Sequence, residues 1–267
     1  MAVDHYENFP VASVLLPARL RRPVALIYRF AREADDFADE GEDPPEIRLR
    51  NIGRFSAQLD LLEQGRPPGI AWFTELGQII DEHRLSLTLF RDLLSAFAQD
   101  VTVNRYPHHA AVMDYCRRSA NPVGRLLLAL FRRDSEENLA LSDHVCSSLQ
   151  IINFLQDVAI DWKKDRVYLP LDEMQAAGIT EQDIATGESG PRWQAFMLDQ
   201  CDRALRMMQA GAPLGRILGG RIGLEIRLTA AGGTRILEKI RAVDGDVYRQ
   251  RPVLKWHDWP RLLTRAI

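Results

Sequence analysis

Apolar residues recur at steps of three and four along almost the whole chain, which is the period of an amphipathic α-helix. In the first clear example, Val24, Ile27 and Ala31 share one face of a helix predicted over 23–40. Pro23 suits the first turn of that helix, because the N–H that proline lacks is not needed there. The helix is predicted to end before the acidic, proline-bearing stretch EDPPE.

The same period predicts further helices, while clear strand alternation is hard to find. Pro122 is expected to break one run, since proline cannot continue a hydrogen-bonded helix. The predicted fold class is therefore all-α, with roughly ten helices. The further helices are predicted over 47–64, 70–83, 87–100, 111–119, 123–132, 142–164, 193–210, 216–229 and 234–243.

The composition indicates that the chain is one globular unit. Apolar residues make up 46% and charged residues 27% of the 267 residues, which excludes a disordered or collagen-like chain. No repeat and no shift in composition marks a boundary, so one domain over 1–267 is predicted. The net charge of −3 and the pI near 6.1 argue against a nucleic-acid-binding protein. A polyanionic small substrate stays possible, because a metal ion can supply positive charge.

Cysteine usage and the N-terminal sequence bear on location. The three cysteines are widely spaced and odd in number, so we expect buried free thiols in a reducing compartment. The stretch MAVDHYENFP does not resemble a signal peptide, and no apolar run is long enough to span a membrane. The expected location is the cytoplasm.

Acidic residues share a face of the first predicted helix with other polar side chains. Asp35 and Asp39 are four residues apart, and Asp36 lies between them. Arg32 and Tyr28 precede them on the same face at one-turn steps. The helix therefore carries an acidic stripe with a cation and a phenol behind it.

A second acidic stripe lies in the helix predicted over 142–164. Asp157 and Asp161 repeat the four-residue spacing, and Asn153 and Gln150 extend the stripe towards the N-terminus of the helix. The sequence around this stripe is apolar, so its polar groups need partners.

Acids at this spacing most often form a solvated helix face, which is the simplest alternative. Two features argue against it here. Like charges one turn apart repel, so they do not stabilise a helix. Burial would also raise the pKa values of clustered carboxyls unless a cation lay among them. Mg²⁺ ions held by carboxylates and substrate phosphates satisfy both conditions. Two facing acidic helices with such ions between them predict a diphosphate site.

These motifs resemble those of squalene and phytoene synthases, the head-to-head isoprenoid synthases. DDFAD and QDVAID resemble the paired aspartate-rich motifs of that family, and the likeness covers essentially the whole chain in order. It also includes HYENFP, LIYRFAREADD, YCRRSANPVG, NFLQDVAID, RVYLP, RIL and RQRP. The segments ENFPVAS, ADDFADEG and SANPVGRL look most like the hydroxysqualene synthases of bacterial hopanoid pathways.

The resemblance implies a single-domain isoprenoid-synthase fold around a deep central cavity, with a cluster of up to three Mg²⁺ ions. The implied metal ligands are Asp35, Asp36, Asp39, Asn153, Asp157 and Asp161, and the aspartates other than Asp36, with Tyr28, are the implied catalytic residues. The implied substrate-binding residues are His5, Phe9, Arg32, Gln150, Asn153, Arg166, Tyr168 and Arg251. Among them, Tyr28 is also compatible with core packing, and Arg166 with a cation at a helix C-terminus.

The implied reaction converts presqualene diphosphate and water to hydroxysqualene and diphosphate, with no nicotinamide. Gly233 stands where several relatives carry tyrosine, and we expect it to leave room for water. Phe9, Phe30 and Phe154 are candidates for stabilising a carbocation, although each is equally suited to a core. The alternatives are condensation of two prenyl diphosphates, as in presqualene diphosphate, squalene or phytoene synthesis, and a non-catalytic helical protein that binds metal or lipid. Peripheral contact with the inner membrane face is compatible with a nearly insoluble C30 product, and the oligomeric state is left open.

Overall fold

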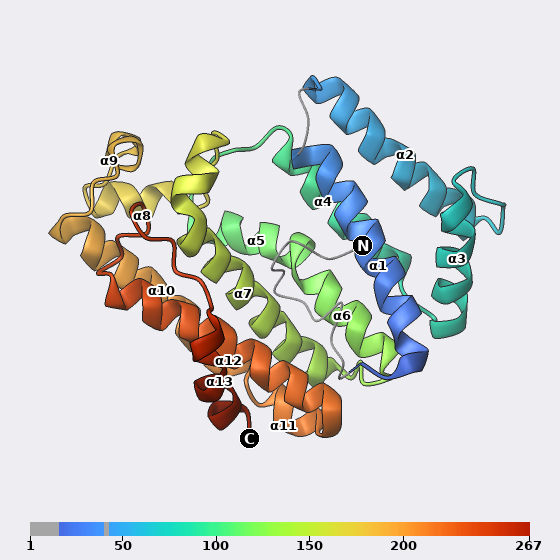
Figure 1. Cartoon of the computed structure of the whole chain (residues 1–267). Coiled ribbons are helices and arrows are strands. Elements are labelled where there is room, and N and C mark those ends of the chain that lie inside the picture. The colour runs from blue at the N-terminus through green and yellow to red at the C-terminus, as the bar shows by residue number, and fades with distance from the viewer. Residues whose placement is uncertain (1–15, 40–42) are drawn as a thin grey trace.

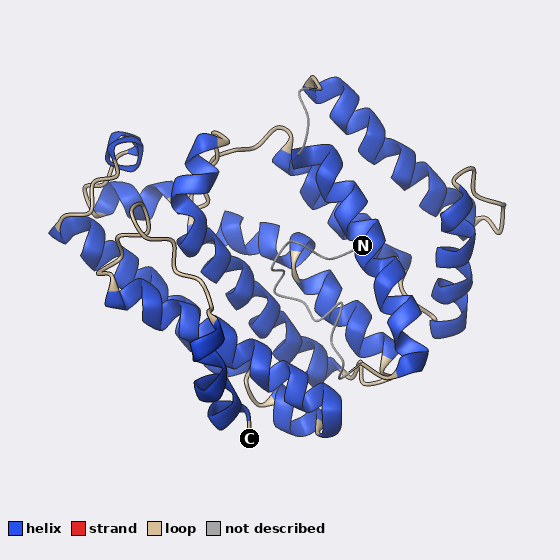
Figure 2. Ribbon diagram, in the orientation of Figure 1, coloured by secondary structure: helices blue, strands red, loops and turns tan. Residues whose placement is uncertain are grey.

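Helices make up nearly all the regular structure of the computed structural model, which describes residues 16–39 and 43–267 (Figures 1 and 2). Over those two stretches the only β pairing is a single bridge between Arg105 and Val167. The all-α prediction is confirmed. The helices are α1 (Ala18–Asp39), α2 (Pro45–Glu63), α3 (Ala71–His83), α4 (Leu87–Asp100), α5 (His109–Ser119), α6 (Asn121–Leu130), α7 (Glu136–Lys163), α8 (Leu171–Ala176), α9 (Glu181–Thr186), α10 (Pro191–Gly211), α11 (Leu214–Leu218), α12 (Gly220–Ala242), the 3₁₀ helix η1 (Trp256–Asp258) and α13 (Trp259–Ala266).

Helices α1 to α4 and α6 enclose one cluster of buried apolar side chains, the N-terminal core. Phe30 of α1 is fully buried at its centre. Its ring centroid lies between 5.1 and 5.9 Å from those of Phe55, Phe73 and Phe90. The tilted and edge-to-face geometry of these rings is the arrangement that aromatic pairs favour. Phe30 is therefore a core residue.

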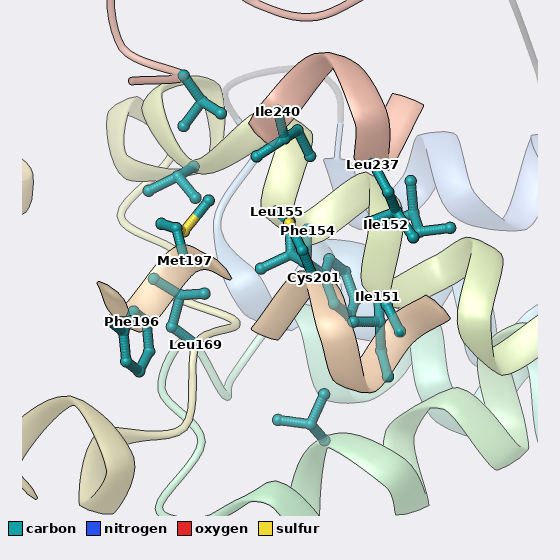
Figure 3. Close-up of a cluster of buried hydrophobic side chains, with 14 of the residues drawn as sticks. Ile151, Ile152, Phe154, Leu155, Leu169, Phe196, Met197, Cys201, Leu237 and Ile240 are labelled. Atoms are coloured by element: carbon teal, nitrogen blue, oxygen red, sulfur yellow. The ribbon is translucent and has the colours of Figure 1, made fainter. Parts of the chain in front are cut away.

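Helices α5, α7, α10 and α12 enclose the second cluster, the C-terminal core (Figures 1 and 3). Helix α7 crosses the middle of the molecule and supplies Ile151, Ile152 and Leu155 to it (Figure 3). The two cores meet at α4, where Ala96 belongs to the C-terminal core and Phe97 to the N-terminal core. The two acidic stripes thus lie on helices from different cores.

Gly124 allows α6 to approach α7 closely. A Cβ atom at Gly124 would contact Ser142 Oγ and would lie 2.6 Å from Cys146 Sγ. The break before this helix is confirmed: α5 ends at Ser119, and Pro122 lies in the first turn of α6. Because Asn121 accepts a hydrogen bond from Ser147 Oγ at 2.8 Å, the break is fastened to α7.

Several helix boundaries differ from the prediction. Helix α1 begins at Ala18, so Pro23 lies inside it, and the burial of Leu20 offsets the one hydrogen bond that proline removes. Helix α7 begins at Glu136, because the Ser135 side chain caps it by accepting a hydrogen bond from the Asn138 N–H. The helix predicted over 216–229 is broken at Gly219, whose φ of 59° separates α11 from α12. Helix α12 then continues through 230–233, where a break was predicted.

The described part of the chain adds short elements that the periodicity did not predict. Helices α8, α9 and α13 and the 3₁₀ helix η1 have at most eight residues each, too few for a clear apolar period. The three cysteines are buried and free, as predicted. None of the described helices is long and apolar enough to cross a membrane.

Candidate active site

The first acidic stripe occupies the last two turns of α1. Arg32 Nη2 lies 2.8 Å from Asp36 Oδ1, and Arg32 Nη1 lies 3.8 Å from Asp35 Oδ2. Asp39 is the last residue of the helix, and Tyr28 lies half-buried on the same side two to three turns earlier. The predicted stripe is therefore present on α1.

The chain that leaves α7 joins the second stripe to the first. Arg166 Nη1 lies 2.6 Å from Asp39 Oδ1, and Lys164 Nζ lies 3.1 Å from Asp39 Oδ2. Asp165 adopts a left-handed conformation with a φ of 58°, which ends α7 as C-terminal caps commonly do. The turn is closed by a hydrogen bond of 2.9 Å from the Arg166 N–H to the Asp161 carbonyl. The end of α1 and the segment that follows α7 thus meet through ion pairs.

Arg251 is brought to the second stripe from the C-terminal segment. Its guanidinium binds both carboxylate oxygens of Asp157, with 3.1 Å between Nη2 and Oδ2. Gln156 fastens the same segment by donating to the Pro252 carbonyl. Asp258 anchors the segment further on through ion pairs with Arg235 and Lys239. Arg251 thus lies beside the second stripe, and its role in binding diphosphate stays a prediction.

Burial and like charge shift two of the stripe carboxyls strongly. Burial, and then the charge of Asp39, raise the pKa of Asp35 to about 7. Burial, and then the charge of Asp157, raise the pKa of Asp161 to about 7, although Arg166 opposes the shift. The charge of Asp39 on α1 also contributes to the raised pKa of Asp161 on α7. The charges of the two stripes therefore act on each other.

The stripe residues fit Mg²⁺ by donor type. In residues 16–39 and 43–267, no three His, Cys, Asp or Glu side chains form a ready-made metal cage. Mg²⁺ does not require one, since it keeps several waters and is usually held by one or two carboxylates with substrate phosphates. The raised pKa values of Asp35 and Asp161 identify carboxyls whose ionised forms a cation would stabilise. Asp36, Asp39 and Asp157, meanwhile, contact protein cations.

Helix α7, which carries the second stripe, also lines an apolar cavity with its N-terminal half. Asn153 and Gln150 are half-buried, and Leu149 one turn before Asn153 lines an apolar cavity between α6, α7, α11 and α12. At about 1.5 Å per residue, Leu149 lies about 12 Å along the axis from Asp157. The other lining residues are Gly124, Leu127, Leu128, Phe131, Ser142, Val145, Cys146, Leu214, Leu218, Ile222, Glu225, Ile226 and Thr229. This order suits a molecule with an anionic head and a long apolar tail.

One expectation about this region is wrong. Gly233 does not open space, because a Cβ atom there would lie 3.0 Å from Leu149 Cδ2 and Met208 Cε and 3.1 Å from Ile152 Cδ1. The missing side chain lets α12 pack against α7 and α10. Gly233 is a packing residue.

Two residues of the site were not predicted from the sequence. Lys164 contacts Asp39, and the cations in the last turn of α7 were the signal available for it. Asp100, at the end of α4, accepts a hydrogen bond from Tyr168, which was itself predicted. A single acidic residue at the end of an apolar helix belongs to no spaced pattern, so nothing in the sequence indicates its role. His5 and Phe9 lie outside the described residues.

Comparison with known proteins points in one direction. The family model described as squalene/phytoene synthase matches residues 2–259. A hydroxysqualene synthase of Zymomonas mobilis is 40% identical over 181 residues, which are 67% of this chain and 59% of that protein. Another, from Rhodopseudomonas palustris, is 34% identical over 240 residues, covering 89% of this chain and 80% of that protein.

Solved structures agree with this likeness. The crystal structure of a squalene synthase from Alicyclobacillus acidocaldarius matches with a TM-score of 0.83 and 30% identity, covering 90% of each chain. A phytoene synthase of Cereibacter sphaeroides is also similar, at 31% identity over 214 residues, which are 76% of this chain and 60% of that protein. The resemblance predicted from the motifs is confirmed.

Proposed function

The chain belongs to the squalene/phytoene synthase family, and we propose that within it the protein is a hydroxysqualene synthase. Its reaction would convert presqualene diphosphate and water to hydroxysqualene and diphosphate. The observation that carries the proposal is the layout of α7, whose C-terminal end lies at the Asp157–Arg251 and Asp39–Arg166 ion pairs and whose N-terminal half lines the apolar cavity. The names of the relatives at 40% and 34% identity support this choice within the family.

The basic residues at the end of α7 would hold the diphosphate. Arg166, Lys164 and Arg251 bring three cations to the two acidic stripes, where charge accumulates as the carbon–oxygen bond breaks. The residues proposed to hold Mg²⁺ are Asp35, Asp36, Asp39, Asn153, Asp157 and Asp161. When bound, the metal supplies Lewis-acid stabilisation of the departing diphosphate.

The apolar part of the site would protect the carbocation that remains. The apolar lining of the cavity around Leu149 would exclude bulk water, so the cation could rearrange before it is captured. The rings of Phe154 and Tyr168 are stacked with centroids 3.9 Å apart and are proposed as the nearest aromatic faces. One water would then add its oxygen to the cation and release a proton. Contact with a membrane surface is part of the proposal, because the C30 alcohol is nearly insoluble.

Separate incubations with each candidate substrate test the proposal. The purified protein with Mg²⁺ and no nicotinamide should convert presqualene diphosphate to hydroxysqualene, and excess chelator should abolish the reaction. It should leave farnesyl and geranylgeranyl diphosphate unchanged. Consumption of either of these would favour the condensation reaction, for which the phytoene synthase relative is the supporting observation. Metal binding without diphosphate release would favour a non-catalytic protein.

A further inference from the structure

Asp100 is a buried acid held by two phenols beside the candidate site. Its side chain lies at the end of α4, and the residue is 8% exposed. Tyr115 Oη donates a hydrogen bond of 2.6 Å to Asp100 Oδ2, and Tyr168 Oη donates one of 3.3 Å to Oδ1. The two donors come from α5 and from the segment after α7. Asp100 therefore connects three parts of the chain through one carboxylate.

The same residue contacts the cation that joins the stripes. Arg166 Nη2 donates to the Asp100 carbonyl oxygen at 3.2 Å, while Arg166 Nη1 binds Asp39. Tyr168 is thus held at two points: Asp100 accepts from its hydroxyl, and Phe154 stacks on its ring with an angle of 4° between the planes. Asp100 contacts both Arg166 and Tyr168, which the proposed function assigns to the diphosphate.

A carboxyl in this position is costly, so packing alone does not explain it. Burial raises the pKa of Asp100 to about 6, against the hydrogen bond from Tyr115 and the charge of Arg166. A carboxylate is well suited here because it offers an acceptor oxygen to each phenol. An amide offers one acceptor oxygen, and an apolar side chain would leave two buried hydroxyls without partners.

We propose that Asp100 is a positioning residue of the active site, whose side chain fixes Tyr168 beside Arg166 so that both face the diphosphate together. This inference rests on the proposed function, because it takes Arg166 and Tyr168 as diphosphate contacts. Asp100 itself need not touch the substrate. Supporting residues of this kind typically change affinity or activity by about 10–100-fold when they are replaced.

Binding of inorganic diphosphate tests the inference without involving the prenyl chain. In calorimetric titrations with excess Mg²⁺, Asp100→Asn should weaken diphosphate binding by about tenfold or more. The matched control is Asp60→Asn, which removes a carboxylate bound to Arg91 at the other end of the same α4 helix. The control should bind diphosphate as the parent does, and equal binding by Asp100→Asn would overturn the inference. A parent protein that binds no diphosphate would instead remove the proposed function, and the inference with it.

A double-mutant cycle separates positioning from a general loss of structure. Tyr168→Phe removes only the hydroxyl that Asp100 holds, so it should also weaken diphosphate binding. If Asp100 acts through Tyr168, the double variant should bind no more weakly than Asp100→Asn alone. Fully additive losses of binding free energy would overturn the inference that Asp100 acts through Tyr168. Should Asp100→Asn fail to fold, Tyr168→Phe tests the same link, and unchanged binding by that variant would overturn the inference.

Discussion

At the scale of single residues, the buried carboxylates of the site lower the stability of the folded protein. The pKa of Asp161 is raised to about 7 by burial and by the charge of Asp157, whereas an unfolded aspartate titrates near 4. The folded state therefore binds the proton more tightly than the unfolded state. Its stability falls as the pH rises from about 4 to about 7 and is then constant.

Asp161→Asn should therefore stabilise the metal-free protein at pH 8, by roughly 0.5–2 kcal/mol, because it removes a buried charge next to Asp157. The gain should shrink as the pH falls below about 7 and vanish near pH 4. Urea unfolding at several pH values measures it, with the exposed Asp60→Asn as the control. Loss of stability at pH 8 would show instead that Asp161 serves the fold.

The same substitution should reduce turnover of presqualene diphosphate by several orders of magnitude, since Asp161 is a proposed metal ligand. Steady-state rates at saturating Mg²⁺ measure the loss. A stabilised protein that kept its activity would contradict the assignment of Asp161 to the site.

At the scale of helices, the sequence predicted the positions of the long elements and of both acidic stripes. The spacing of Asp35 and Asp39, and of Asp157 and Asp161, placed each pair on one helix face. Helix ends were less predictable, because the burial of Leu20 and the capping by Ser135 depend on tertiary contacts. The ion pair between Asp39 and Arg166 could not be predicted from the sequence either, since no local pattern indicates a contact between residues so far apart.

Gly233 illustrates how packing decides what a small residue does. Gly233→Ala should lower stability by about 1–3 kcal/mol, because the new Cβ atom meets three side chains at 3.0–3.1 Å. Gly53→Ala in α2 is the matched control, since a Cβ atom there has nothing within 4 Å and alanine favours the helix. Thermal unfolding compares the two variants. Stabilisation by Gly233→Ala would restore the view that the residue leaves free space.

At the scale of the whole molecule, the site ties the N-terminal core to the C-terminal core. Helix α1 belongs to the first and α7 to the second, and α4 contributes to both. We therefore expect one cooperative unfolding transition, whose midpoint rises when Mg²⁺ and diphosphate are added together, because ligand binding to the folded state stabilises it. Calorimetry with and without chelator measures this. Two independent transitions would contradict the coupling.

In the proposed reaction, water is the group that captures the carbocation and ends the sequence of steps. The direct measurement is mass spectrometry of the product formed from presqualene diphosphate and Mg²⁺ in isotopically labelled water. We predict hydroxysqualene that carries oxygen from the solvent, at a rate and yield that reduced nicotinamide does not change. Squalene formed only with reduced nicotinamide, or an alcohol without solvent oxygen, would contradict the proposed function.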